Sequence, residues 1–332
     1  MTKDPVATIT PSETPDLTND PAGPTPQRPS FDPTPGTSGP REFSKDDSAR
    51  VTKALLLLVR ALELITFETA SDPPPQGSTA DRLWRSAERG YALDGFITMQ
   101  YANMSALDHV RGFVALVRTP TVRSTALATV ARGAHESLAR TWHLLSHSSD
   151  EDFMYRTLCF LRSDLRYSEL LNGTVHTRDG DPVDPAAKRA FYAAELTRLQ
   201  LPPQVRTDIS VMVAAMLDAE FGDDGGREYY SDLSSIAHAH RPGLNTFVTT
   251  DDEGKISGLS APRAVVVELA VHLIGVIHGV GRQFIAFYGN QIRHVEHMET
   301  AVRRALRTVG PVAESVWPST DPNPKRRGTP AT

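Results

Sequence analysis

The sequence contains one cysteine, Cys159, among its 332 residues. A single cysteine excludes an intramolecular disulfide, and it also excludes the cysteine-based zinc and iron–sulfur sites that need several thiolates. A lone thiol is typical of a protein kept in a reducing compartment, so we expect a cytoplasmic location. The first residues, MTKDPVATIT, lack the apolar stretch of a secretory signal, which supports the same expectation.

An excess of positive charge is also absent, because 35 Lys and Arg residues stand against 40 Asp and Glu residues and the formal net charge is −5. Binding to phosphate backbones depends on clustered cations, so this balance argues against a general nucleic-acid binder. Several enzyme motifs are missing as well. We find no P-loop, no dinucleotide-binding glycine fingerprint, no H-E-x-x-H and no G-x-S-x-G.

The two ends of the chain are poor in apolar residues. Residues 1–44 hold ten of the 25 prolines and have aromatic residues only at Phe31 and Phe43. Proline at this density blocks helices and strands, and little apolar surface is left to offset the entropy of ordering. Residues 317–332 have the same character. We therefore predict disordered tails, of which the N-terminal one either stays solvated or serves as a docking or phosphorylation segment.

Residues 45–316 predict a single all-α domain, a multi-helix bundle, because apolar residues recur at helical spacing between turn signals. The stretch 264–281 is apolar, but Glu268, His272 and His278 interrupt it, which favours a buried core helix and argues against a membrane. We expect a loop at 173–185 and a hairpin at 246–258. Helices are expected over residues 46–70, 79–118 with a break near Gly90, 121–147, 150–171, 186–200, 203–220, 227–240, and 262–288 with a kinked continuation to 307.

A polar stripe follows the third predicted helix, opposite an apolar face that includes Leu138. One interpretation is a solvated face with i,i+4 ion pairs. The other is a site in which Glu136 orients an arginine while a histidine titrates. Two histidines four residues apart also suit a metal, but without a third ligand we expect no metal. The stripe consists of Arg132, Glu136, Arg140, His143 and His147.

Two further segments carry ionisable residues. His238 and His240 end the predicted helix 227–240, where they either cap the helix or provide acid–base chemistry. The long apolar helix places small and ionisable residues on one face, which indicates either close packing or a groove. A di-iron site is disfavoured, because its Glu-x-x-His pattern is absent. This face consists of Glu268, His272, Gly275, Gly279 and Arg282.

The order of these parts carries a resemblance. The pattern Arg132-x-x-x-Glu136-x-x-x-Arg140-x-Trp142 is followed by Tyr230-Ser-Asp-Leu-Ser234-x-x-x-His238. This arrangement resembles a group of uncharacterised actinobacterial helical proteins and, more distantly, the HEPN helical superfamily. The HEPN resemblance implies an all-α bundle that dimerises.

In active HEPN members an arginine, followed after four to six residues by a histidine, cleaves RNA at the dimer interface. No arginine stands at that spacing before His238 or His240. Arg140 and His147 fit the spacing, but they belong to another predicted helix. The closer analogy is therefore to the inactive members that act as binding or dimerisation modules.

We predict a cytoplasmic helical binding or regulatory module that forms homo-oligomers and needs no cofactor. Its groove would lie between the third helix, the His238 helix and the Gly275–Gly279 face. A protein partner is compatible with the composition, whereas RNA is unsupported by the net charge. Two alternatives remain: an RNA-cleaving enzyme of the HEPN type with a His/Arg site, and a small-molecule or metal binder in the bundle core. The predicted polar centre is Arg132, Glu136, Arg140, His238 and His240, with His143, His147, Glu268, His272 and Arg282 as secondary candidates.

Overall fold

The computed structural model describes residues 43–318, except for residues 72, 120–123, 148, 171–172, 177–179, 205–207 and 223. Over these residues the chain forms eleven helices and two small antiparallel sheets, so the predicted all-α class is confirmed. The predicted tails lie outside the described residues, apart from positions 43–44 and 317–318. The elements are α1 (Lys45–Ser71), α2 (Thr79–Arg85), α3 (Arg89–Arg118), α4 (Thr125–Leu145), α5 (Asp150–Leu170), β1 (Val175–His176), β2 (Pro182–Val183), α6 (Pro185–Arg198), α7 (Ile209–Phe221), α8 (Gly226–Ala237), α9 (Arg241–Asn245), β3 (Val248–Thr250), β4 (Ile256–Leu259), α10 (Arg263–Phe287) and α11 (Ile292–Val316).

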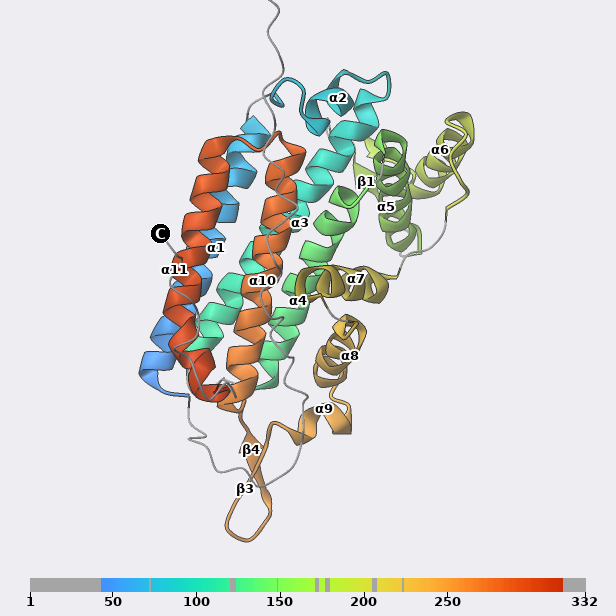
Figure 1. Cartoon of the computed structure of the whole chain (residues 1–332). Coiled ribbons are helices and arrows are strands. Elements are labelled where there is room, and N and C mark those ends of the chain that lie inside the picture. The colour runs from blue at the N-terminus through green and yellow to red at the C-terminus, as the bar shows by residue number, and fades with distance from the viewer. Residues whose placement is uncertain are drawn as a thin grey trace, which may run out of the picture. The chain divides into compact units, whose positions relative to one another are not determined.

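Five long helices form a bundle with a continuous apolar core: α1, α3, α4, α10 and α11 (Figure 1). The α3 helix contacts both α1 and α4, and α10 contacts α1, α4 and α11. The apolar residues on each helix recur every three or four positions and so form one buried face, as Leu55, Leu58 and Leu62 do on α1. Burial of these faces against one another is what holds the bundle together.

The α4 helix is shared between the bundle and the shorter helices beside it. It contacts α3 and α10 in the bundle, and it also contacts α7 and α8 (Figure 1). Its apolar face is buried as predicted, with Leu127, Ala131 and Leu138 fully enclosed. The polar stripe of α4 therefore lies beside the shorter helices, whose residues its side chains contact.

The start of α1 is fixed by reciprocal capping. The Ser44 hydroxyl accepts from the Asp47 N–H at 3.0 Å, and the Asp47 carboxylate accepts from the Ser44 N–H at 3.1 Å. Arg263 of α10 donates to the same carboxylate at 2.9 Å and, with Ser44, holds the pKa of Asp47 below its usual value. Phe43 was expected in the N-terminal tail, but it is only 8% exposed and belongs to the core.

Two predictions about local structure are wrong, one at Gly289 and one over residues 173–185. A kink was expected at Gly289, but the chain reverses there, because Gly289 and Asn290 both adopt positive φ of 87° and 52°. The α11 helix consequently packs back against α10 and continues to Val316, beyond the expected end. The segment 173–185 was expected to be a loop, but it contains the short β1–β2 pairing. The hairpin expected at 246–258 is confirmed as β3 and β4.

The most apolar helix of the described chain, α10, is an internal part of the bundle. Its mean hydropathy of 1.9 over 18 residues and its length make it the one described helix able to span a membrane by composition alone. In the structure 67% of that window is buried. A core helix buried within a bundle has these properties, as the sequence predicted.

Candidate functional site

The polar face of α4 meets α8 at Arg132. The guanidinium Nε donates to Glu136 Oε1 at 2.7 Å, one turn along the same helix. Its Nη2 donates to the Tyr230 hydroxyl at 3.3 Å, and its Nη1 lies 3.0 Å from Nε2 of His238. One side chain of α4 thus contacts two residues of the α8 segment, so the structure brings together Arg132, Glu136 and His238 of the predicted polar centre. We call Arg132, Glu136, Tyr230 and His238 the Arg132 centre.

His238 occupies the C-cap of α8. Its N–H bonds the Ser234 carbonyl at 3.0 Å, and Ala239 then adopts φ of 57° and ends the helix. Because a guanidinium only donates, Nε2 of His238 is the acceptor in this hydrogen bond, which leaves Nδ1 as the ring nitrogen that carries the proton. The ring is exposed, and none of the described residues hydrogen-bonds Nδ1. His238 therefore both caps α8 and presents a donor to solvent.

Tyr230 completes the Arg132 centre from within α8. The residue is 6% exposed, and its hydroxyl donates to Glu136 Oε1 at 2.7 Å. Burial raises the pKa of Tyr230 to about 12, and the hydrogen bond to Glu136 adds to this effect, so the phenol remains a donor. Burial opposes the charged form of Arg132, but Tyr230 and Glu136 outweigh it and raise its pKa.

Tyr230 was not among the predicted site residues. The available signal was its spacing, because Tyr230, Ser234 and His238 are four residues apart and share one helical face. That spacing alone does not show which helix faces them. The approach of α4 to α8 supplies the missing information.

A cluster of rings lies next to the Arg132 centre, in the adjacent core. His135 is fully buried, and its Nδ1 donates to the Ala131 carbonyl at 2.7 Å. The Tyr229 ring lies 5.7 Å from His135 and stacks at 4.1 Å on His272. Burial lowers the pKa of His135 to about 4, so this histidine is neutral. The secondary candidate His272, whose Nδ1 donates to the Glu268 carbonyl, therefore belongs to the packing between α8 and α10.

Three other predicted residues of the α4 stripe contact α5. Arg140 pairs with Asp164 at 3.2 Å, in place of the expected pair with Glu136. The ring of His143 lies 5.4 Å from that of Phe160, and burial lowers the pKa of His143 to about 4. His147 packs edge-on against the ring of Phe153, 5.4 Å away. The structure does not bring these three residues to the Arg132 centre.

His240 also lies apart from the arginine. Its ring is exposed and centred 6.0 Å from that of His238, and it precedes the first residue of α9. Arg140 and His147, whose spacing matches active HEPN members, also have different partners. Arg140 pairs with Asp164, and His147 packs on Phe153. The side-chain contact between Arg132 and His238 instead joins α4 to the end of α8.

The groove predicted along Gly275 and Gly279 is filled by α7. A Cβ at Gly275 would meet the Phe221 ring at 2.6 Å, and one at Gly279 would overlap the Glu220 carboxylate. Burial raises the pKa of Glu220 to about 7, against the opposing charge of Arg282. The glycines thus serve close helix packing. Glu268 is 8% exposed and Arg282 is exposed, so the secondary candidates on this face do not share a cleft.

Among the residues that the structure describes, no group of three or more His, Cys, Asp or Glu side chains could hold a metal ion. The comparisons with known proteins add no assignment: no family model matches the chain, and neither the curated proteins nor the solved structures give a match. The geometry of the Arg132 centre therefore carries the functional argument.

Proposed function

We propose that this chain is a helical binding module whose recognition site is the Arg132 centre. The observation that carries the proposal is the set of contacts made by the Arg132 guanidinium with Glu136, Tyr230 and His238, which belong to two helices. A network held in place by packed helices presents its free edge in a fixed geometry, which lowers the entropy cost of binding.

The atoms of the Arg132 centre that have no partner in the described chain, Glu136 Oε2 and His238 Nδ1, complement the hydrogen-bonding groups of an amide. Glu136 Oε1 accepts from both Arg132 and Tyr230, while none of the described residues bonds Oε2. His238 keeps Nδ1–H as a donor. An acceptor and a donor side by side complement the N–H and C=O of a peptide or carboxamide. The arginine charge is already balanced by Glu136, which favours an uncharged polar ligand over a phosphate. A protein partner fits this chemistry.

We also propose self-association through α1 and α3. Thr66 and Asn103 are hydrogen-bonded at 3.3 Å between the two helices, and each is followed by an exposed apolar residue. Phe67 is 50% exposed and Met104 is 45% exposed. Apolar side chains gathered on a helical surface favour a second copy or a partner. A cytoplasmic location is part of the proposal and is supported by the single cysteine.

Peptide-array binding tests the recognition site, with His238→Ala as the variant and His240→Ala as its matched control on the same segment. We expect the wild type and His240→Ala to bind the same peptides, and His238→Ala to lose them. Equal binding by all three proteins, or no binding by any, would contradict the proposed site.

Light scattering after gel filtration tests self-association. Phe67→Ser with Met104→Ser should give monomer, whereas the control Ile292→Ser, at a residue 70% exposed on α11, should not.

A second function, RNA cleavage of the HEPN type, is favoured by one specific contact. Nη1 of Arg132 lies 3.0 Å from Nε2 of His238, so a potential acid–base group and a cation meet at an exposed edge. Incubation with a labelled single-stranded RNA tests it. Cleavage by the wild type and His147→Ala, but not by His238→Ala, would establish the enzyme. Equal cleavage by all three, or none, would eliminate it.

A further inference from the structure

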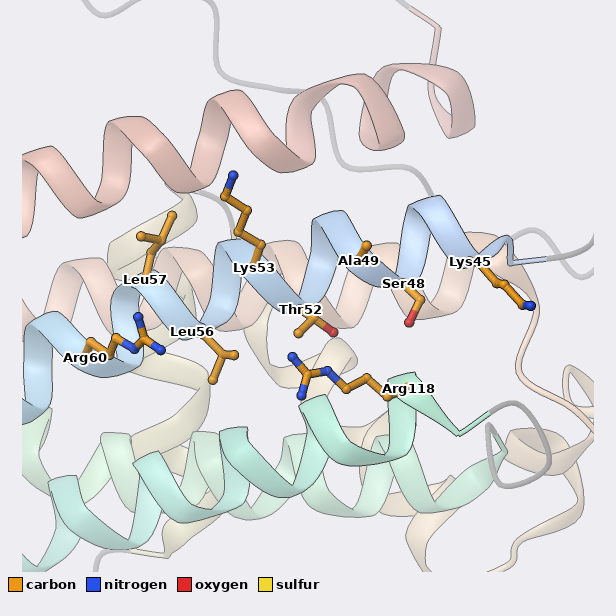
Figure 2. Close-up of a pocket in the computed structure, with 9 residues that line it drawn as sticks. All are labelled: Lys45, Ser48, Ala49, Thr52, Lys53, Leu56, Leu57, Arg60 and Arg118. Carbon is orange, nitrogen blue, oxygen red and sulfur yellow. The ribbon is translucent and has the colours of Figure 1, made fainter.

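A second polar feature lies between α1 and the end of α3. A groove of about 500 Å³ opens there, and Figure 2 shows Arg118 reaching from α3 toward Thr52 on α1. Its lining contains four basic side chains and no acidic one. The basic residues are Lys45, Lys53, Arg60 and Arg118.

The basic side chains of this groove are uncompensated. Within the described chain, Lys45, Lys53, Arg60 and Arg118 make no ion pair and no side-chain hydrogen bond. The neighbouring carboxylates are already engaged elsewhere. Asp46 pairs with Arg50 at 2.7 Å, Asp47 with Arg263 at 2.9 Å, and Glu63 with Arg111. The groove therefore concentrates positive potential on a chain whose net charge is −5.

Thr52 gives an independent indication of a ligand. The residue lies at the base of the groove and is 3% exposed, yet its hydroxyl has no hydrogen-bond partner. Buried hydroxyls are nearly always paired, so an unpaired one beside free cations indicates a missing acceptor. Ser48 next to it donates to the Val117 carbonyl at 3.1 Å, which fixes the end of α3 and with it the position of Arg118.

We propose that this groove binds the phosphate group of a phosphate monoester. The Thr52 hydroxyl donates to one oxygen at the base, and the guanidinium group of Arg118, which Figure 2 shows next to Thr52, binds the others from α3. Lys45, Lys53 and Arg60 add positive potential at longer range. Leu56 forms an apolar wall for the organic part of the ligand. This site is separate from the Arg132 centre, so either can exist without the other.

Isothermal titration with glycerol phosphate, at ionic strength matched by sodium chloride, tests the site. We expect the wild type to bind, and we expect Thr52→Val and Arg118→Gln each to weaken binding by about tenfold. Arg111→Gln is the matched control, because Arg111 lies on the same face of α3 but is paired with Glu63. It should bind as the wild type does. Thr52→Val removes only a buried, unpaired hydroxyl, so its melting temperature should not fall, and a loss of binding then reports on the site.

A second arm distinguishes a soluble phosphate ester from a lipid headgroup. Flotation with phosphatidic acid vesicles, compared with phosphatidylcholine vesicles, should give binding that Thr52→Val abolishes if the source is a lipid. Binding in either arm that depends on Thr52 and Arg118 supports the proposal. The absence of binding in both experiments would overturn the proposal. Binding that Arg118→Gln and Arg111→Gln weaken equally would also overturn it, because the effect would then be general charge attraction.

Discussion

Arg132 Nη1 and His238 Nε2 lie 3.0 Å apart, although 106 positions separate the two residues in the chain. The guanidinium donates and Nε2 accepts in this contact, because a guanidinium has no acceptor. It therefore ties the end of α8 to α4. The same contact selects the tautomer that offers Nδ1–H to a ligand.

The Tyr230 hydroxyl should contribute measurably to stability. Tyr230→Phe removes the donor to Glu136 and the acceptor for Arg132 while the ring stays in place. We expect the free energy of unfolding to fall by about 1.5–3 kcal/mol, as for other hydrogen bonds to charged groups. Urea denaturation measures this change. Tyr101→Phe is the control, because Tyr101 is 70% exposed, and an equal loss in both variants would rule out a special role for the Arg132 centre.

His135 should make the fold sensitive to acid. Its pKa is about 4 in the folded chain because of burial, against an ordinary value of 6.5, so the unfolded chain binds a proton more readily. The contribution of neutral His135 to the free energy of unfolding is complete above pH 6.5. It is lost as the pH falls toward 4, by up to about 3 kcal/mol. Urea titrations at pH 7 and pH 4.5 should show this loss in the wild type and in the control His240→Gln. The loss should be smaller in His135→Leu, and an unchanged loss there would refute the assignment.

Glu220 should act in the opposite direction. Its pKa is raised to about 7 by burial, so the folded chain holds the proton more tightly than the unfolded chain, whose value is 4.5. The contribution of Glu220 to the free energy of unfolding is therefore fully present below pH 4.5 and is lost as the pH rises through 7. Glu220→Gln keeps the neutral form, so at pH 8 it should be more stable than the wild type by about 1 kcal/mol, after allowance for solvent screening. Melting temperatures at pH 5 and pH 8 measure this. The exposed Glu314→Gln is the control and should show no such gain.

The contact between α7 and α10 depends on the absence of a side chain at Gly275. Gly275→Ala would place a Cβ 2.6 Å from the Phe221 ring, and we expect a loss of about 1–3 kcal/mol through overpacking. Gly112→Ala on α3 meets only the Val130 side chain at 3.4 Å, so it should gain about 0.5–1 kcal/mol from helix propensity. Chemical denaturation compares the two. If both variants were stabilised, α7 would not pack closely on this glycine.

The helical fold follows closely from apolar spacing and from the turn residues, because each helix buries one face. The reversal after α10 was missed because a single Gly289 suits a kink as well as a turn, and Asn290 gives little warning of positive φ. The Arg132–Glu136 pair was predictable from i,i+4 spacing on one helix. Tyr230 was missed, and the sequence left open whether the Gly275–Gly279 face serves close packing or a groove, for the same reason. Both depend on which helix packs on which, and Phe221 shows no sign in the sequence of facing Gly275.

The pairing of α1 with α11 has a consequence during synthesis. The two helices pack along the bundle, and His294 of α11 bonds Glu68 of α1 at 2.7 Å across 226 positions. The part of α1 that α11 covers therefore leaves the ribosome long before α11 has been made. Nascent chains in this state expose surface that aggregates or binds chaperones. We expect the docking of α11 to end this exposure, after α3 and α10 have covered their own parts of α1.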